Sequence, residues 1–570
     1  MSAGDNAGPS PTPGKGHLAG ADQRVVLDIR DLSVRLPKGA DREFAIRDVS
    51  FSVGAGEIVC IVGESGSGKS VTAFTVMGLN NRAELKPVNG EVILGGEDLL
   101  QKSDLEMRRL RGEKMAMIFQ EPMTALNPVM KVGDQILEML EIHSNLSSRE
   151  QKARVLDVMQ NVNLPDHQTM YHAYPHQLSG GQRQRIMIAM ALALEPGLLI
   201  ADEPTTALDV TTQAQILDLI KDIQHRLGMG VLFITHDFGV VAEIADRVVV
   251  MQQGLVVEQG ACRDIIERPE HAYTKMLVGS VPSMVPSHRA EIDKTAPALS
   301  TARLNKVYQD GGWLNPGRKV QAAKDVDLLV YRGETLGVVG ESGSGKSTVA
   351  RCIVRLIDPT SGEVEIAGEN IATLNEAALR EYRRDIQIVF QDPYRSLNPR
   401  RTVGQSIREG PMNFGASHEE AEARAVDLMQ IVGIDPDALE RFPHQFSGGQ
   451  RQRICIARAL AMQPKVLIAD EAVSALDVSV QAQVLDLLDD VRVRFDLAML
   501  FITHDLRVAA QICDRIMVMQ NGVVVEEGPT SEVYADPAHD YTRSLLSAAP
   551  GRDARFFQSP NDAGPEDVIT

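Results

Sequence analysis

The stretch GESGSGKS occurs twice in this chain of 570 residues, at 63–70 and, without a change, at 340–347. An apolar run comes directly before each copy, at 57–62 and 334–339. A glycine-rich turn between a strand and a helix lets backbone N–H groups surround phosphate oxygens, and the helix dipole adds positive potential at the same place. The repeat therefore predicts two phosphate-binding α/β domains, each with a mostly parallel sheet.

Three further stretches recur in the same order in both halves. They are LSGGQRQR and FSGGQRQR (178–185, 446–453), LLIADE and VLIADE (198–203, 466–471), and FITHD (233–237, 501–505). The serine of SGGQ lies 23 residues before the aspartate of the second stretch in both halves, and this aspartate lies 34 residues before the histidine in both. Upstream, Lys69 and Gln120 are 51 residues apart but Lys346 and Gln391 only 45, which predicts a loop insertion in the first half.

The repeat sets the expected domain boundaries. We expect a disordered tail rather than a secretory signal at 1–24, a first domain at 25–280, a linker at 281–300, a second domain at 301–549 and a polar tail at 550–570. Gln-Asn-Gly at 520–522, between two apolar runs, predicts a β-hairpin late in the second domain.

Charge and composition narrow the classes of function. The net charge of -19 lacks the basic excess that is typical of nucleic-acid binding, so we expect no nucleic-acid partner. The longest apolar run, 186–194, is well short of the roughly 18–20 residues that cross a bilayer, so any membrane association is expected to come through a partner. The five cysteines lack metal-ligand spacing, which argues against a disulfide framework or a zinc site.

The last two residues of GESGSGKS have separate expected roles. Lys69 and Lys346 are expected to contact the β and γ phosphates, where a charge-assisted hydrogen bond contributes roughly 1.5–3 kcal/mol. The hydroxyls of Ser70 and Ser347 are suited to Mg²⁺. We therefore predict ATP and Mg²⁺ as cofactors, with ATP bound by Gly63, Glu64, Ser65, Gly66, Ser67, Gly68, Lys69, Ser70, Gly340, Glu341, Ser342, Gly343, Ser344, Gly345, Lys346 and Ser347.

Two acids end the second apolar run in each half. Asp202 and Asp470 stand at the carboxyl end of a predicted parallel strand, where a carboxylate can hold Mg²⁺ through water. Glu203 and Glu471 come next, and a second acid there can orient or deprotonate an attacking water, a role that accelerates a reaction by about 10²–10⁴. The alternative is that these acids merely end a strand.

A histidine follows the next predicted strand in each half. A single histidine at such a place would more often be a core residue, but the recurrence of His236 as His504 at a fixed offset favours contact with the γ phosphate. We predict that Glu203, His236, Glu471 and His504 are the catalytic residues.

Together these motifs resemble the ABC ATPase family. GESGSGKS is similar to its Walker A motif, the acid pair to Walker B, and SGGQ to the signature that separates this family from other P-loop proteins. The resemblance covers nearly the whole chain except the tails and the linker. It implies an antiparallel β subdomain and a helical subdomain beside the parallel core of each domain.

In the ABC ATPase family two domains enclose two ATP molecules head to tail, so the resemblance implies that the Walker motifs of each half face the signature of the other. It adds the signature residues Ser179, Gly180, Gly181, Gln182, Ser447, Gly448, Gly449 and Gln450 and the D-loop residues Asp209 and Asp477 to the nucleotide sites. It adds the Q-loop residues Gln120 and Gln391 to the metal ligands Ser70, Asp202, Ser347 and Asp470. A plain helix N-cap is the alternative for Ser179, Ser447, Asp209 and Asp477, and capping is compatible with the functional role.

Four flanking segments narrow the resemblance to the peptide/nickel importer branch, which includes dipeptide, oligopeptide, glutathione and microcin C types. They are FQEPMTALNP (119–128), FQDPYRSLNP (390–399), HAYTKMLVGSVP (271–282) and HDYTRSLLSAAP (539–550). This branch implies an ATPase peripheral to the cytoplasmic face of the bacterial inner membrane, with two multi-span permeases and a substrate-binding protein as partners. No cysteine follows Cys262 or Cys513 in the tail of its half, so we expect no iron–sulfur cluster of the kind that some relatives carry there.

Two other functions are compatible with tandem ABC domains: a soluble ATPase that acts on ribosomes or DNA, and the motor of an exporter. Ribosome-acting forms usually carry a long, charged helical linker, and the DNA-repair form carries zinc cysteines. Residues 281–300 show neither feature, which favours the importer.

The two halves are expected to differ at two places. DEPT at 202–205 becomes DEAV at 470–473, and because the loss of proline frees φ at Ala472, we predict that both sites hydrolyse ATP but unequally. Phe44 and Trp313 are candidates for stacking on adenine, although a simple packing role suits either residue equally well.

Overall fold

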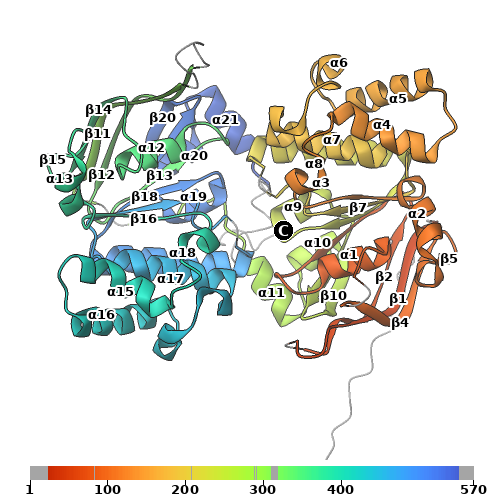
Figure 1. The fold of residues 1–570 in the computed structure, drawn as a ribbon, viewed down its shortest axis with the longest axis horizontal. Coiled ribbons are helices and arrows are strands. Elements are labelled where there is room, and N and C mark those ends of the chain that lie inside the picture. Colours follow the sequence, from red (N-terminus) through yellow and green to blue (C-terminus); the bar gives the residue numbers. More distant parts are fainter. Residues whose placement is uncertain are drawn as a thin grey trace, which may run out of the picture.

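The computed structural model describes residues 24–40, 42–81, 84–206, 208–287, 289, 292–309, 319–474 and 476–550. Two halves lie side by side, and the helical lobes of the two halves lie at opposite corners of the molecule (Figure 1). The tails predicted at 1–24 and 550–570 lie outside the described residues except for Arg24 and Pro550. Across the described ranges, no helix combines the length and apolar character needed to span a membrane.

The core of the first half is a six-stranded sheet in the order β10-β9-β3-β8-β7-β6. Its strands are β3 (Ile58–Val62), β6 (Met115–Ile118), β7 (Leu198–Asp202), β8 (Gly230–Ile234), β9 (Arg247–Gln252) and β10 (Leu255–Ala261). Every pair is parallel except β9 with β10. Strands β3, β7 and β8 are buried along their whole length, as expected for a parallel sheet covered on both faces. The carboxyl ends of these three strands therefore bring the phosphate loop, the acid pair and the histidine to one edge.

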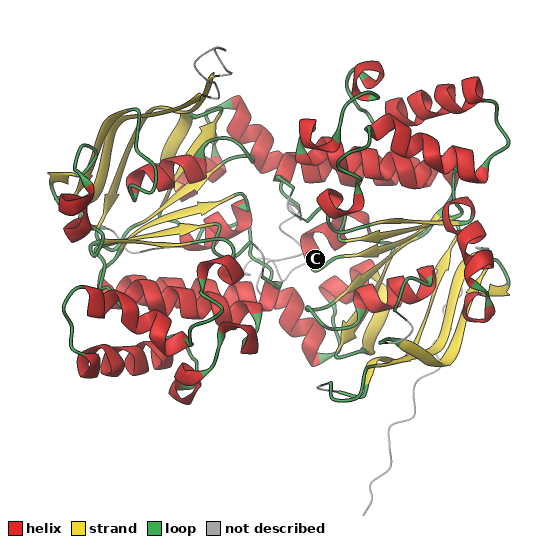
Figure 2. Ribbon diagram, viewed as in Figure 1, coloured by secondary structure: helices red, strands yellow, loops and turns green. Residues whose placement is uncertain are grey.

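A smaller antiparallel sheet and a set of helices complete the first half (Figure 2). The sheet has the order β2-β1-β4-β5, from β1 (Val25–Arg35), β2 (Phe44–Gly54), β4 (Lys86–Leu94) and β5 (Glu97–Asp98). The helices are α1 (Lys69–Met77), α2 (Asp104–Glu113), α3 (Pro122–Ala125), α4 (Val132–His143), α5 (Ser148–Asn161), α6 (His167–Met170), α7 (Gly180–Leu192), α8 (Val210–Leu227), α9 (Phe238–Ile244), α10 (Cys262–Glu267) and α11 (Ala272–Gly279), with 3-10 turns at Leu99–Gln101 and Pro175–Gln177. Helices α4, α5 and α7 pack together in the helical lobe. The predicted combination of a parallel core, an antiparallel subdomain and a helical subdomain is confirmed.

The second half repeats this plan with sheets β16-β17-β18-β13-β19-β20 and β12-β11-β14-β15. Its strands are β11 (Pro297–Gln309), β12 (Lys319–Tyr331), β13 (Thr335–Val339), β14 (Ser361–Ile366), β15 (Glu369–Asn370), β16 (Ile386–Val389), β17 (Val466–Asp470), β18 (Ala498–Thr503), β19 (Arg515–Gln520) and β20 (Val523–Pro529). Its helices are α12 (Lys346–Ile353), α13 (Glu376–Tyr382), α14 (Pro393–Ser396), α15 (Val403–Asn413), α16 (His418–Ile431), α17 (Gly448–Leu460), α18 (Val478–Phe495), α19 (Leu506–Ile512), α20 (Thr530–Ala535) and α21 (Asp540–Ser547), with 3-10 turns at Pro436–Glu440 and Pro443–Gln445. Asn521 and Gly522 join β19 to β20 with φ of 49° and 81°, which confirms the predicted hairpin.

Strand register locates the predicted insertion in the first half. Leu27 pairs with Leu94 between β1 and β4, and Leu299 pairs with Ile366 between β11 and β14, so Leu94 and Ile366 are equivalent. Leu94 lies 25 residues after the loop lysine of its half, and Ile366 lies 20 residues after the lysine of the other. Five of the six additional residues therefore lie between α1 and the end of β4.

The last helix of each half packs on the other half. Helix α11 contacts α18 and α21 contacts α8, near the centre of the molecule in Figure 1. Val210, the first residue of α8, belongs to the hydrophobic core of the second half, and Val478, the first residue of α18, packs against the core of the first. Reciprocal apolar contacts therefore join the two halves.

The predicted linker divides into a docked segment and a strand. The backbone N–H of Ser287 donates to a carbonyl of α19 at 3.1 Å, and Arg289 donates to Asp489 of α18 at 2.9 Å. Strand β11 begins at Pro297, inside the range assigned to the linker, and pairs with both β12 and β14. The antiparallel sheet thus begins inside the predicted linker and includes its last four residues, 297–300.

Candidate active site

The phosphate loop of each half comes directly after β3 or β13 and packs tightly against its surroundings. Gly68 has φ of 105°, and a Cβ there would lie within 2.5 Å of a side-chain carbon of β2, so the loop leaves no room for a side chain at this position. Lys69 is buried, and its Nζ donates to the carbonyl oxygens of Gly63 at 2.6 Å and Glu64 at 3.0 Å. Lys346 makes the equivalent two bonds at 2.7 and 2.8 Å. Both lysines thus lie inside their loops, at the carboxyl edge of the parallel sheet.

A hydroxyl and a carboxylate lie beside each loop. Ser70 donates to Asp202 at 3.1 Å, and Ser347 donates to Asp470 at 2.9 Å. Burial raises the pKa of Asp202 to about 6 in spite of the hydrogen bond from Ser70, and burial likewise raises the pKa of Asp470. Each half therefore has a serine hydroxyl beside an aspartate, and a bound cation would favour the ionised form of this aspartate, which burial disfavours.

The carboxylate of Glu203 receives three side-chain contacts. Gln120 donates to it at 2.8 Å and Thr206 at 3.0 Å, and His236 Nδ1 lies 3.2 Å away. The backbone of Glu203 has φ of 45°, a left-handed conformation that residues other than glycine rarely adopt. Burial alone would raise its pKa, but the hydrogen bond and charge of His236 outweigh burial and lower the pKa of Glu203. The same contact raises the pKa of His236 against the effect of its burial.

Glu471 has the same backbone and one fewer donor on its carboxylate. Its φ is 50°, Gln391 donates to it at 2.9 Å, and His504 Nδ1 lies 3.5 Å away. Ser474, which replaces the threonine of the first half, donates to the backbone carbonyl of Glu471 at 3.0 Å instead. Burial opposes the change, but the contact with His504 lowers the pKa of Glu471 as well.

Each signature serine caps its own helix. Ser179 accepts a hydrogen bond from the backbone N–H of Gln182 at 3.3 Å, and Ser447 accepts one from Gln450 at 3.2 Å. The N-cap alternative therefore describes both serines. Among the described residues, neither hydroxyl is hydrogen-bonded to the phosphate loop of the other half.

The D-loop of the second half reaches the phosphate loop of the first. Asp477, which precedes α18, accepts hydrogen bonds from the N–H of Ser65 at 2.9 Å and from its hydroxyl at 3.1 Å. Ser479 donates to the side chain of Glu64. Asp477 therefore does not cap α18 with its side chain but contacts the opposite half.

The reverse contact is only partly equivalent. Thr211 donates to Glu341, as Ser479 does to Glu64 on the other side, but Asp209 caps its own helix by accepting from Thr212 at 2.9 Å. The signature of the first half packs closely on the start of α8, since a Cβ at Gly181 would lie 2.5 Å from the side chain of Thr212. The structure thus brings each set of lysine, serine, acids, glutamine and histidine together within its half, and joins the phosphate loops to the other half through the residues around the D-loops.

Phe44 and Gln321 occupy equivalent places beside the two phosphate loops. Phe44 pairs with Arg35 between β1 and β2, and Gln321 pairs with Val307 between β11 and β12. Both residues lie 25 positions before the loop lysine, a count that identifies the pair from the sequence. The guanidinium of Arg35 lies 5.6 Å from the centre of the Phe44 ring. The other candidate, Trp313, lies outside the described residues.

Two tyrosines that sequence reasoning left without a role contact the phosphate loops. The hydroxyl of Tyr273, on α11, accepts a hydrogen bond from the backbone N–H of Glu64 at 3.0 Å, and that of Tyr541, on α21, accepts one from Glu341 at 3.0 Å. Burial raises the pKa of Tyr541 to about 12, so this hydroxyl stays protonated at neutral pH. The signal was visible as the repeat of HAYT as HDYT, but the position of these helices required the structure.

Each phosphate loop contains a buried lysine and lies beside a hydroxyl–carboxylate pair and a glutamate with a lowered pKa. Each loop also accepts or donates hydrogen bonds with residues at the start of a helix of the opposite half. This geometry defines the class of tandem ATP-hydrolysing proteins whose two sites meet at an interface between domains.

The chain belongs to the ABC transporter family. The family description "ABC transporter" matches residues 46–206 and 323–474, and "Oligopeptide/dipeptide transporter, C-terminal region" matches 257–310 and 525–563. The second pair of ranges includes the segments with Tyr273 and Tyr541, so the predicted resemblance to peptide importers is confirmed.

Relatives of known description cover nearly the whole chain. "Glutathione import ATP-binding protein GsiA" of Salmonella choleraesuis (strain SC-B67) is 46% identical over 569 residues, and the protein of the same description from Escherichia coli O6:H1 is 47% identical over 570; each comparison covers 94% of this chain and 91% of the relative. Among solved structures, "Dimeric structure of a post-hydrolysis state of the ATP-binding cassette MJ0796 bound to ADP and Pi" is 29% identical, with 42% of this chain and 99% of that chain covered and a TM-score of 0.38. The family match and the two glutathione import relatives show that this chain is an ATPase of the ABC transporter family.

Proposed function

We propose that this chain is the ATPase subunit of an importer for glutathione or short peptides. The observation that carries the proposal is that both halves keep a full set of reacting groups in one geometry, within a chain similar over 94% of its length to glutathione import ATP-binding proteins. Both domains are therefore proposed to hydrolyse ATP, and neither serves only as a structural partner.

Mg²⁺ fits the oxygen donors beside each phosphate loop. This ion prefers oxygen ligands and is commonly held by one or two carboxylates together with substrate phosphates. We assign it to Ser70, Asp202 and Gln120 in the first site and to Ser347, Asp470 and Gln391 in the second. When bound, the ion neutralises charge on the phosphate oxygens.

Glu203 and Glu471 are proposed to accept a hydrogen bond from the attacking water. Because their pKa values are lowered, both carboxylates are ionised at neutral pH and are ready to orient or deprotonate that water. His236 and His504, whose pKa values are raised, are proposed to carry positive charge to the γ phosphate, where charge develops during transfer. Lys69 and Lys346 bind the β and γ phosphates.

ATP is proposed to complete each site by drawing the two halves together. The signature serines, at helix N-termini, then offer hydroxyl and helix dipole to the γ phosphate held by the other half. The first site takes Ser447, Gly448, Gly449, Gln450 and Asp477, and the second takes Ser179, Gly180, Gly181, Gln182 and Asp209. The contact between Asp477 and Ser65 supports this pairing, because it already joins the second half to the first phosphate loop.

The partners are proposed to be two multi-span permeases and a substrate-binding protein, with the chain peripheral to the cytoplasmic face of the bacterial inner membrane. The import function of the glutathione import ATP-binding proteins to which the chain is similar supports this assignment. Closure and reopening of the two halves would then drive the permeases.

Purification of the tagged chain from detergent-solubilised membranes tests the proposal. We expect two multi-span permeases to co-purify and to stimulate ATP hydrolysis, and vesicles containing the complex and its binding protein to accumulate glutathione or a short peptide only with ATP. Recovery of ribosomes or nucleic acid without a permease would overturn the import function and leave the ATPase standing.

A further inference from the structure

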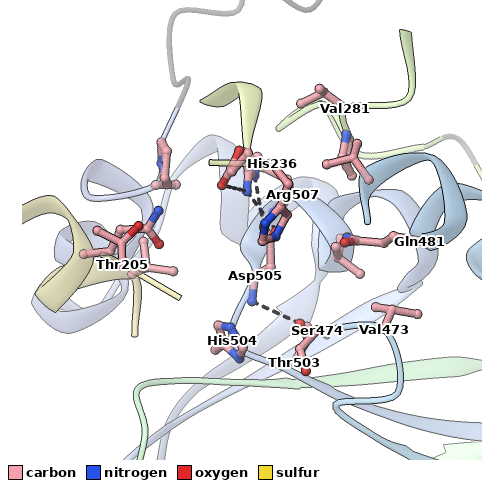
Figure 3. A pocket seen from close by; sticks show the side chains of 18 of the residues that line it. Thr205, His236, Val281, Val473, Ser474, Gln481, Thr503, His504, Asp505 and Arg507 are labelled. Carbon is pink, nitrogen blue, oxygen red and sulfur yellow. Dashed lines mark hydrogen bonds and ion pairs between the residues drawn. The ribbon is translucent and has the colours of Figure 1, made fainter. Parts of the chain in front are cut away.

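A cavity of about 110 Å³ lies between the two halves, next to the two histidines assigned to the γ phosphates (Figure 3). Most of its lining consists of equivalent residues from the two halves, such as His236 with His504 and Thr235 with Thr503. One equivalent pair differs in charge: the first half has Gly239 where the second has Arg507, each three residues after its histidine. Arg507 is therefore a buried cation at this interface that has no counterpart in the first half.

Arg507 is shared between two carboxylates, one from each half. Its Nη1 and Nη2 donate to the two oxygens of Asp237, both at 2.9 Å, and its Nε and Nη2 donate to Asp505 at 3.1 and 3.0 Å. Only 9% of the Arg507 side chain is exposed. A bidentate, shielded contact of this kind fixes both position and orientation of its partners.

The space for Arg507 exists because the first half has glycine. A Cβ at Gly239 would lie 2.3 Å from Nη1 of Arg507. A side chain at position 239 and the arginine at position 507 therefore exclude one another, and in this chain the arginine comes from the second half.

The two aspartates connect this bridge to the reacting groups. Asp237 directly follows His236, and its Oδ1 also caps α9 by accepting from Gly239 at 2.8 Å. Asp505 directly follows His504 and caps α19 in the same way, by accepting from the N–H of Arg507 at 2.9 Å. Each of these histidines contacts the glutamate of its own site. One guanidinium thus holds the start of the two helices that follow the two histidines.

The pKa values of Arg507 and Asp237 agree with this arrangement. Burial opposes charge on Arg507, but Asp237 and Asp505 keep the pKa of Arg507 well above its usual range. Burial would raise the pKa of Asp237, and the charge and hydrogen bonds of Arg507 lower it instead. The bridge is therefore ionic at neutral pH.

We propose that Arg507 is a positioning residue that couples the two ATP sites. Because the turn after His236 and the turn after His504 are bonded to one guanidinium, a displacement of either histidine acts on the other through two ionic contacts. ATP hydrolysis at one site then depends on the state of the other. This inference requires the ATPase but not the import of any solute.

The purified full-length chain, with its ATPase measured directly, is the system for the test. In the unaltered chain we expect Glu203→Gln or Glu471→Gln to reduce total hydrolysis by far more than half, because each site needs the other. In Arg507→Lys, which keeps a charge but loses the planar bidentate contact, each of the two substitutions should remove only the contribution of its own site, so that the two losses add up to about the whole activity of that variant, and the Hill coefficient for ATP should fall toward about 1.

Arg515→Lys is the matched control. Arg515 is also a partly buried arginine of the second half and also bridges two carboxylates, but Glu334 and Glu527 both belong to its own half. We expect this control to leave the Hill coefficient and the dependence of one site on the other unchanged.

Moving the arginine from position 507 to position 239 tests whether coupling needs only the ionic bridge or needs an arginine at position 507 itself. Arg507→Gly leaves two partly buried carboxylates without their cation, whereas the double variant Arg507→Gly/Gly239→Arg returns the cation from the first half, because the turns after the two histidines are equivalent. We expect the double variant to restore coupling. If Arg507→Lys keeps full coupling, or if the double variant folds without restoring it, Arg507 has no coupling role and the inference is wrong.

Discussion

The carboxylate of Glu203 receives contacts from three side chains, whereas that of Glu471 receives them from two. The backbone does not account for this difference, since φ is 45° and 50° at the two positions. The difference comes from the neighbouring hydroxyl, because Thr206 donates to the carboxylate and Ser474 donates to a backbone carbonyl. A duplicated site can therefore keep its reacting groups while the residues around them diverge.

The same divergence occurs on two other sides of the sites. Phe44 beside the first phosphate loop corresponds to Gln321 beside the second. At the interface, Gly239 corresponds to Arg507. The replacement of Pro204 by alanine, by contrast, leaves the backbone of the preceding glutamate alone, so we attribute the expected inequality of the sites to the hydroxyls and not to the proline.

The largest expected effect is at the glutamates. Gln in place of Glu203 or Glu471 should lower hydrolysis at its own site by about 10²–10⁴, and the two variants should keep unequal residual rates because only Glu203 has the third donor. Steady-state ATPase of the two variants measures this. The exchange Thr206→Ser with Ser474→Thr is the control and should reverse the order of the two residual rates; equal residual rates in the original pair would contradict the asymmetry.

The next largest effect is expected on the affinity for ATP when the residue beside the phosphate loop, Phe44 or Gln321, is replaced. If Phe44 stacks on the base, Phe44→Gln should weaken ATP at the first site by about 1–3 kcal/mol, the range found for stacking of bases on aromatic side chains. Gln321→Phe should strengthen ATP at the second site by a smaller amount. Titration of each variant with a fluorescent ATP analogue checks both changes, in a chain whose other site is inactivated by substitution of its phosphate-loop lysine. An unchanged affinity in Phe44→Gln would leave Phe44 with a packing role.

In their response to pH the two halves should behave alike. Burial raises the pKa of Asp202 to about 6, so below about pH 6 a proton competes with Mg²⁺ for this carboxylate; burial also raises the pKa of Asp470, so the same competition begins there at a higher pH than at an ordinary aspartate. The Mg²⁺ concentration for half-maximal activity should therefore rise as pH falls, by up to about tenfold per pH unit, and at the first site it should be flat above about pH 7. Activity measured against Mg²⁺ at several pH values, separately with Glu203→Gln and Glu471→Gln, tests this. A pH-independent requirement in both would argue against the assigned metal ligands.

The smallest expected effect is at the tyrosines. Tyr273→Phe and Tyr541→Phe each remove the acceptor for one backbone N–H of a phosphate loop, a loss of about 1 kcal/mol or about fivefold in affinity for ATP. Binding titrations should show similar losses for the two variants, with kcat less affected than KM. A loss in one variant only would show that the two C-terminal helices support their loops differently.

Much of the fold could be predicted from the sequence because the repeat fixes the order of local signals. The phosphate loops, the buried strands before them and the hairpin at Asn521 and Gly522 each depend on residues adjacent in the chain. The reacting groups of one half are similarly determined, since Asp202 and His236 end neighbouring parallel strands and must meet at one edge.

Contacts between distant residues could not be predicted in this way. The exchange of donor between Thr206 and Ser474 depends on side-chain rotamers, and the bridge from Arg507 to Asp237 joins residues 270 positions apart. The start of β11 at Pro297 was missed because pairing on both sides, not local composition, makes that segment a strand.

Arg507 and Gly239 also determine which halves can pair. A pair of two first halves would place glycine opposite glycine and leave two aspartates without a cation. A pair of two second halves would place an arginine side chain where the structure has Gly239, a position at which even a Cβ would lie 2.3 Å from Nη1 of Arg507. We therefore expect the mixed pair to be preferred over either pair of identical halves, and we expect the same preference if the two halves are made as separate chains.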